Sequence, residues 1–390
     1  MDDALTVPSA CHGEDMAKET ARQRQAVDHP SARRRHLRGG TLVVRCSPTD
    51  VQLGTDARWA VRLSDVTENE IAWLRALAAG GRYSAALHRT HRVDELRARQ
   101  LWQALDAAGY TVPAPPADGS WPLNDEFAHS HLREDGRGDL TLADRRQRCV
   151  AIHGLGRLGL ATGRILHTAG VGTLLLDDAR PVTRLDLAPD AYSPEHLGRP
   201  RDQVARHLLG LGAAGRPSGR SARVPAPDVV VVVEAWAHDA RRFARLCAEG
   251  VPHLAVQVHE ASTTIGPFVV PGRTPCLRCL DLARLAADPR WRDVAAHLHA
   301  LPPGRTGEET TITATAAALA AAQVISALDG GRPRTADTVL ETGLPDVVPR
   351  VRPTSPHPGC GCGADGATPG LDDAKGDVAV PGPMPLHAAS

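Results

Sequence analysis

The sequence predicts an α/β protein, in which a Rossmann-like domain with a mainly parallel sheet follows a small winged-helix-like α+β domain. Three observations support this prediction. From about residue 141, short apolar runs alternate with helical segments ("CVAIHG", "LGLATGRILHTAG", "TLLLDD"), a pattern typical of parallel sheets with helices on both faces. A glycine-rich turn joins the first run to its helix. Two tight cysteine pairs follow late in the chain and indicate a metal site.

Length and charge limit the classes of protein to consider. The chain has 390 residues, enough for two domains, and its 45 Lys and Arg residues equal its 45 Asp and Glu residues. A general nucleic-acid binder needs a basic face, so we expect no nucleic-acid partner. The first thirty residues lack the apolar core of a signal peptide, and the valine run at 229–233 is too short to span a membrane. The segment "TATAAALAAAQVISAL" contains Thr and Gln and is expected to be a buried helix. We therefore expect a soluble, cytoplasmic protein with no membrane partner.

The sequence divides into five segments. Residues 1–36 are polar and are expected to form a disordered arm. Residues 37–115 contain three β-type runs ("TLVVRC", "VQLGT", "WAVRLS") and then three helical segments, the first of which begins with a capping box of Thr67 and Glu70. The Pro-rich stretch "PAPPADGSWP" indicates a linker over 116–140. Residues 141–363 form the predicted nucleotide-binding domain, and 364–390 are expected to be a disordered tail.

The glycine turn has the full G-x-G-x-x-G spacing at Gly154, Gly156 and Gly159, between a strand and a helix. Glycines allow a tight turn and a close approach of backbone to phosphate, and the helix N-terminus supplies unpaired N–H groups. Asp177 and Asp178 close the next strand, where an acid typically accepts hydrogen bonds from ribose hydroxyls. The alternative is a tight turn without a ligand. The glycines by themselves do not choose among NAD, FAD and ATP.

The late cysteines form a C-x-x-C pair and a C-x-C pair. Four thiolates in a tetrahedron make a closed structural zinc site, and we expect this role in preference to reduced free thiols. His357 lies just upstream of the second pair and is the alternative to one thiolate. The expected zinc ligands are Cys276, Cys279, Cys360 and Cys362.

The segment "HTAGVGTLLLDD" resembles the ThiF/MoeB/HesA family, the bacterial relatives of ubiquitin-activating enzymes. The resemblance continues over about residues 145–363, because "GPFVVPGRTPCLRCLDL" and "HPGCGCG" are similar to the two zinc knuckles of the family and "TITATAAALAAAQVISALDGG" to its closing helix. It implies a ThiF-type fold that binds ATP with Mg²⁺, carries a structural Zn²⁺, adenylylates the C-terminus of a protein or peptide, and forms a homodimer.

The resemblance assigns two positions of this chain to the nucleotide site, one with the family's residue and one with a replacement, and a third candidate residue lies inside the glycine turn. The ribose-binding acid falls at Asp178, with Asp177 the alternative. Arg157 lies inside the turn, where it would meet phosphate or stay solvated. The family's nucleotide lysine is replaced by Arg201, which either neutralises phosphate or is a solvated residue at a helix start.

Other positions of the family's site are lost. Asp186 and Pro189 stand where the family carries an Asn and an Arg that reach the nucleotide, and the metal-binding Asp falls at Ala235. Glu234 is adjacent and would act in its place or serve an ion pair. Adenylylation brings a carboxylate against a triphosphate, so the loss of these groups weakens the site.

The segment 37–115 resembles, in layout and position, the PqqD-like modules that bind leader peptides in ribosomal peptide maturation. There a peptide adds a strand to a sheet edge and packs on a helix. The alternatives are a dimerisation module and a DNA-binding winged helix.

Three functions follow from these observations. The leading hypothesis is an ATP-dependent adenylyltransferase that acts on a peptide or small carrier protein, in the maturation of a peptide natural product. The alternative is a catalytically silent scaffold that binds a leader peptide and delivers it to a partner maturation enzyme, a reading motivated by Pro189 and Ala235. An NAD-dependent oxidoreductase is a third reading, which the cysteine pairs and the AGVG segment disfavour.

Overall fold

The computed structural model describes residues 4–5, 35–113, 124–211, 225–300 and 307–364. The chain divides into two compact units, Met1–Ala143 and Asp144–Ser390, which are described separately. Most of the predicted arm and tail therefore lies outside the described residues. The predicted arm is nevertheless not wholly without structure, since Ala4–Leu5 forms a strand and the last two residues of the arm belong to the strand Arg35–Leu37, each paired with a strand of the first unit.

The first unit contains two small sheets. The larger has the order β1-β5-β4-β3, in which β3, β4 and β5 are antiparallel neighbours and β1 runs parallel to β5. Its strands are β1 (Ala4–Leu5), β3 (Val43–Arg45), β4 (Val51–Leu53) and β5 (Val61–Leu63). The smaller sheet pairs β2 (Arg35–Leu37) with β6 (Thr111–Pro113) and so joins the two ends of the predicted domain.

Three helices follow the strands in the predicted order: α2 (Glu68–Ala78), α3 (Ala85–Thr90) and α4 (Glu95–Ala107). The capping box at the start of α2 is present, since the Thr67 hydroxyl accepts from the Glu70 N–H at 3.3 Å and the Glu70 carboxylate accepts from the Thr67 N–H at 2.8 Å. Apolar side chains of the strands pack against those of the helices in one core that includes Leu53, Trp73 and Leu101.

The predicted linker is partly helical. Residues 114–123, which hold most of its Pro-rich stretch, lie outside the described residues, but α5 (Asn124–Leu132) and α6 (Gly138–Arg146) follow. Acidic residues lie in the first turn of α5 and histidines in its last turn, an arrangement that favours the helix dipole. The sequence analysis does not predict this helix, because the Pro-rich residues before it indicate a linker.

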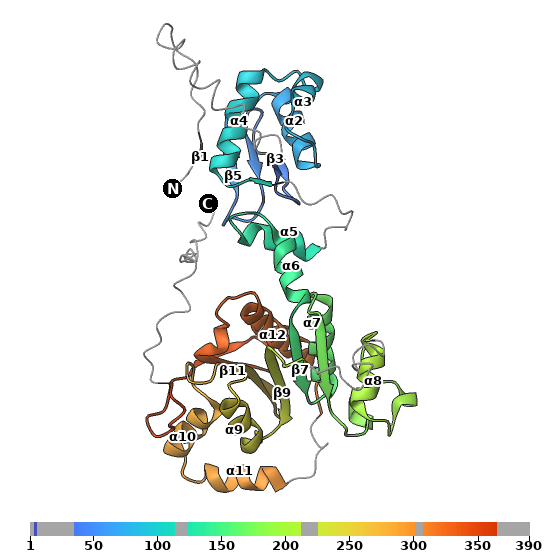
Figure 1. The fold of residues 1–390 in the computed structure, drawn as a ribbon, viewed down its shortest axis with the longest axis vertical. Helices are drawn as coiled ribbons and strands as arrows, with labels where there is room; N and C mark the ends of the chain where they lie inside the picture. The colour runs from blue at the N-terminus through green and yellow to red at the C-terminus, as the bar shows by residue number, and fades with distance from the viewer. Residues whose placement is uncertain (1–3, 6–34, 114–123, 212–224, 301–306, 365–390) are drawn as a thin grey trace. The chain divides into compact units, whose positions relative to one another are not determined.

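The second unit is built on a sheet that has seven strands among the described residues (Figure 1). Its order is β13-β12-β11-β10-β9-β7-β8; β8, β7, β9 and β10 are parallel, and β11 to β13 are antiparallel. The strands are β7 (Cys149–His153), β8 (Thr173–Asp177), β9 (Val229–Ala235), β10 (His253–Val258), β11 (Ser262–Val269), β12 (Thr338–Gly343) and β13 (Arg350–Pro353). The predicted α/β class is confirmed.

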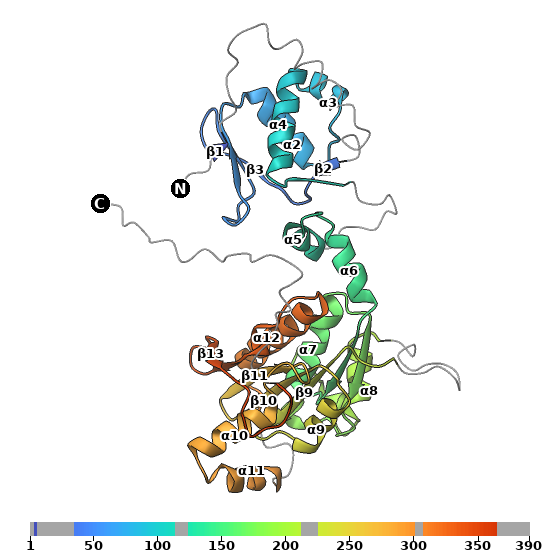
Figure 2. The ribbon, with the colours of Figure 1, turned by 60° about the vertical axis from the view of Figure 1, so that its left-hand side comes forward.

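Helices cover both faces of this sheet (Figure 2). The valine run in β9 shows why: Val229, Val231 and Val233 pack toward a core shared with α7 (Arg157–Thr168) and α12 (Thr310–Leu328). Val230 and Val232 pack on the other face with Phe243 and Leu277. These last two residues belong to helices α9 (Ala240–Ala248) and α10 (Leu277–Ala287). A strand buried on both faces needs a continuous apolar run. The described residues of the unit also form helices α8 (Arg201–Leu208) and α11 (Trp291–Ala300).

Among the described helices, α12 alone has the length and apolar composition to cross a membrane. It packs against α7 and β11, and its alanines at 316, 317, 320 and 321 are fully buried. These contacts identify α12 as a core helix of the second unit, as predicted for this Ala-rich segment.

Candidate functional site

The glycine turn connects β7 to α7 as the sequence predicts. Gly154 has φ +86°, and a side chain there would collide with the Val233 carbonyl of the neighbouring strand β9. Gly156 is the N-cap of α7, and Gly159 is buried in the first turn of the helix. The turn therefore lies at the carboxyl ends of the parallel strands, where ligands bind in open α/β sheets.

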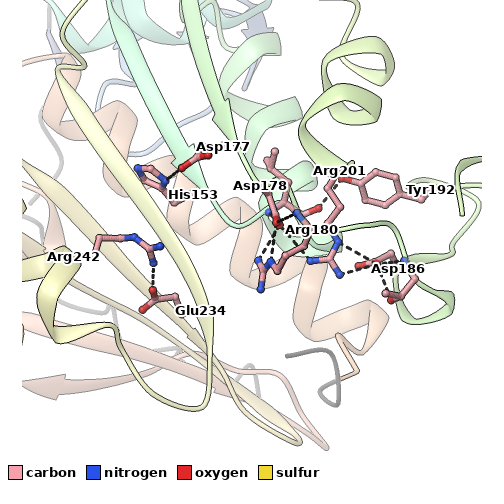
Figure 3. A network of polar contacts seen from close by, with 11 residues as sticks. His153, Asp177, Asp178, Arg180, Asp186, Tyr192, Arg201, Glu234 and Arg242 are labelled. Atoms are coloured by element: carbon pink, nitrogen blue, oxygen red, sulfur yellow. Dashed lines mark hydrogen bonds and ion pairs between the residues drawn. The ribbon is translucent and has the colours of Figure 1, made fainter. Parts of the chain in front are cut away.

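Asp178 enters this turn from the end of β8. Its buried carboxylate accepts from the Leu155 N–H at 2.8 Å and from two nitrogens of Arg180 at 2.7 and 2.9 Å, and Arg201 lies at 3.3 Å (Figure 3). Burial alone would raise its pKa, but the hydrogen bonds from Arg180 and Leu155 and the charge of Arg201 hold the pKa below its ordinary value. The acid is thus ionised and fully engaged by protein groups.

Arg201 is the first residue of α8, and it is buried between two carboxylates, at 2.8 Å from Asp186 and 3.3 Å from Asp178. The reading of Arg201 as a solvated helix-start residue is therefore wrong. Asp186 also accepts from the Thr183 N–H at 2.7 Å. Burial lowers the pKa of Arg201, but the two carboxylates more than offset this, so the pKa is raised.

The structure separates two other predicted residues from this network. Asp177 is 68% exposed and lies 2.5 Å from the His153 ring, away from Asp178 (Figure 3). Arg157 has its partners outside the Asp178 network; it donates to the Glu308 carbonyl at 2.6 Å and to the Thr310 hydroxyl at 3.1 Å. Asp178 is the better placed of the two strand-end acids to face a ligand.

At the end of β9, one of the two candidate metal-binding positions is uncharged, and the carboxylate at the other is already paired within the protein. Ala235 stands where the resemblance expects the metal-binding acid. Glu234 and Ala235 both line a pocket beside the glycine turn. The Glu234 carboxylate, however, is paired with Arg242 and accepts from the Asp239 N–H at 2.9 Å. The pocket is lined by Gly156, Arg180, Thr183, Leu185, Asp186, Arg201, Val233, Glu234, Ala235, Val258 and Glu308.

Three of these lining residues escaped the sequence analysis as site residues. Arg180 lies two residues beyond Asp178, so a basic residue directly after strand-end acids was an available signal. The sequence analysis treats Asp186 only as a replacement for the family's Asn, whereas its carboxylate forms an ion pair with Arg201. Glu308 precedes α12 by two residues and has no local motif. Its carboxylate accepts from the Leu158 N–H, so it reaches the glycine turn from 150 residues away.

The four predicted zinc ligands come together at a second place in this unit. Cys276 is the N-cap of α10 and Cys279 lies in its first turn, while Cys360 and Cys362 follow β13. The four sulfur atoms lie within 4.8 Å of one another. Cys276 Sγ is 3.5 Å from Cys360 Sγ, Cys279 Sγ is 3.6 Å from Cys362 Sγ, and the C-x-x-C pair is 3.9 Å apart.

These separations fit a tetrahedral zinc ion. Zn–S bonds of about 2.3 Å place neighbouring sulfurs roughly 3.8 Å apart. His357 is not a member of the cluster; its ring accepts from the Gly359 N–H at 3.1 Å. The donor set is therefore four thiols, and the alternative with His357 is not supported.

No family model matches this sequence, and no curated protein matches it. Several solved structures, however, match the fold of this chain. E. coli MccB with succinimide is 17% identical, with a TM-score of 0.59, over 84% of this chain and 99% of that chain. The microcin C7 biosynthetic enzyme MccB in complex with N-formylated MccA is 17% identical, with a TM-score of 0.60, over 85% and 99%. PaaA is 13% identical, with a TM-score of 0.56, over 80% and 98%. At these identities the likeness establishes the fold, and it is the ThiF-like fold that the sequence motifs implied.

Proposed function

From this ThiF-like fold, we propose that the chain is a peptide-binding scaffold whose nucleotide site does not catalyse adenylylation. The observation that carries the proposal is the end of β9, where Ala235 replaces the expected metal-binding acid and Glu234 is held by Arg242. Without a free carboxylate at the end of β9, the described residues there offer no ligand to hold the Mg²⁺ that a triphosphate needs for adenylylation. The structure thus favours the alternative hypothesis over the leading one.

The charged side chains that line the pocket, and the Asp178 carboxylate that pairs with two of them, support the same conclusion. Asp178 and Asp186 share Arg201, and Arg180 covers Asp178. A nucleotide entering this pocket would have to break these pairs to use either acid or either arginine. A working phosphoryl- or nucleotidyl-transfer site keeps such groups aimed at the ligand.

Two observations support a peptide partner. Asp144–Ser390 makes up less than two thirds of the chain, so the likeness to MccB over 84–85% extends into Met1–Ala143. MccB has been solved with the peptide MccA. In the first unit, the edge of β5 pairs with Ala4–Leu5 of the same chain as a parallel strand, so this edge can accept an added strand that would take the place of β1. We propose residues 37–115 as the peptide-binding domain, with delivery of the peptide to a partner maturation enzyme.

We further propose that Cys276, Cys279, Cys360 and Cys362 hold a structural Zn²⁺. The ion would tie the segment after β13 to the start of α10, and four protein ligands would leave no open position for catalysis. A homodimer and a cytoplasmic location remain parts of this proposal that rest on the resemblance and the composition.

One observation favours adenylylation as a second candidate. The glycine turn and Asp178 are in place, and E. coli MccB has been solved with ATP. Pyrophosphate exchange with Mg-ATP and a pool of synthetic peptides distinguishes the two. The scaffold predicts no exchange in the wild type. Exchange that depends on Asp178 and on an added peptide would establish the enzyme.

Peptide binding is tested by selection from a displayed library of random 20-residue peptides against the full chain. The proposal predicts binders that share a sequence motif and that protect the amides of β5 from hydrogen exchange. A chain lacking Met1–Leu5 should bind them at least as well, because β1 no longer occupies the edge. Binders that protect only the second unit would contradict the proposal.

A further inference from the structure

The carboxylate of Glu308 lies at the N-terminus of α7, the end of the helix at which proteins with a G-x-G-x-x-G turn bind phosphate. Its Oε2 accepts a hydrogen bond from the backbone N–H of Leu158, in the first turn of α7. A side chain on Gly156 would collide with Oε1 of the same carboxylate. The close approach that this glycine allows is therefore used by a side chain of the protein itself.

Glu308 is anchored on both sides. Arg157 donates to its carbonyl at 2.6 Å and to the Thr310 hydroxyl at 3.1 Å. The next residue, Glu309, caps α12, where its carboxylate accepts from the N–H groups of Thr311 and Ile312 at 2.8 and 2.9 Å. Because α12 packs along α7, the start of α12 holds Glu308 at the turn.

We propose that Glu308 is an internal anion that closes the glycine turn, so that a nucleotide phosphate reaches the α7 N-terminus only by displacing it. Carboxylate and phosphate are both anions and would compete for the same N–H group and the same space. This inference goes beyond the scaffold proposal, which rests on Ala235, and it holds whether or not the site retains catalysis.

The charges around Glu308 are consistent with a carboxylate that a phosphate group can displace. Burial of the carboxyl group raises its pKa, and the nearby Asp186 adds to this, while the Leu158 N–H, Arg201 and Arg157 lower it. The net direction is upward, so the ionised form is less favoured here than in water. An ionised phosphate with more acceptor oxygens would meet the same N–H groups and the same arginines.

The test is calorimetric titration of the full chain with Mg-ATP and, separately, with inorganic pyrophosphate. Removal of one negative charge within about 4 Å of a phosphate should tighten binding by about tenfold or more. We expect Glu308→Ala to bind both probes at least about tenfold more tightly than the wild type. Glu308→Gln should fall between them, because the amide still fills the turn but carries no charge. Glu249→Gln, a control that removes one negative charge from an exposed side chain at the end of α9, should behave as the wild type.

Several results would overturn the proposal. One is equal affinity of the wild type and Glu308→Ala for Mg-ATP, including no binding by either. Another is a gain for ATP with none for pyrophosphate, which would place the effect away from the phosphate. Circular dichroism and the urea midpoint verify that each variant is folded, and Glu308→Gln, which preserves shape, keeps the test valid if Glu308→Ala unfolds. Pyrophosphate exchange remains a separate readout, so failure here is distinguishable from failure of the scaffold proposal.

Discussion

Replacement of Asp178 by Asn removes the negative charge at the centre of the buried network. The amide oxygen can still accept from the Leu155 N–H, so the substitution tests the charge and leaves the shape of the turn in place. Loss of one partner from a buried ion pair costs about 3–5 kcal/mol. Arg201 retains Asp186 at 2.8 Å, and the Arg180 side chain is 50% exposed and can turn to water. We therefore expect the lower end, about 3 kcal/mol.

The assay is urea unfolding at several pH values. The pKa of Asp178 is lowered in the folded state, so its contribution is complete above the unfolded value near 3.8 and is lost as the pH falls through the folded pKa. The difference between the wild type and Asp178→Asn should accordingly be full at pH 7 and shrink below about pH 4. Asp177→Asn is the matched control; its side chain is 68% exposed, and we expect a change within about 0.5 kcal/mol.

A cost below about 1 kcal/mol at pH 7, or an equal cost for the two adjacent substitutions, would refute this account of the network. A cost that is the same at pH 3 and pH 7 would show that shape and not charge is responsible.

Three further predictions concern other parts of the chain. Cys279→Ser should lower the melting temperature and the zinc content measured by mass spectrometry, while Cys46→Ser, at an exposed thiol outside the cluster, should change neither; equal zinc content in both would contradict the site. Glu308→Gln should stabilise the protein increasingly as pH rises from about 4.5, because an acid with a raised pKa makes the folded state less stable once it ionises; a difference in urea midpoint that is independent of pH would exclude this. Thr67→Ala should cost about 1 kcal/mol in urea unfolding through loss of the capping box, and no change would mean that the cap contributes nothing.

The features that the sequence predicted well depend on local pattern. The capping box at Thr67 needs only two residues three apart, and the valine run of β9 needs only burial on both faces. The contact between Asp178 and the glycine turn could be predicted because strand ends in a parallel sheet meet at one edge, so the motif and an acid about twenty residues on lie close together. The four cysteines were found by their spacing.

The features that were missed depend on contacts between distant segments. Glu308 reaches the glycine turn from a position 150 residues beyond Leu158, and nothing in the residues around it indicates that contact. The ion pairs of Arg201 with Asp178 and Asp186 could not be predicted either, because an arginine at the start of a helix has the same local sequence pattern whether it is buried or solvated. Helix α5 was missed because the Pro-rich residues before it dominated the composition.

The most direct test of the central claim is pyrophosphate exchange by the zinc-loaded full chain with Mg-ATP and a peptide that it binds. The wild type should show no exchange above background while it binds the peptide, because Ala235 replaces the expected metal-binding acid at the end of β9 and the adjacent Glu234 is paired with Arg242. Exchange that requires the peptide and is abolished by Asp178→Asn would contradict the scaffold and establish an adenylyltransferase.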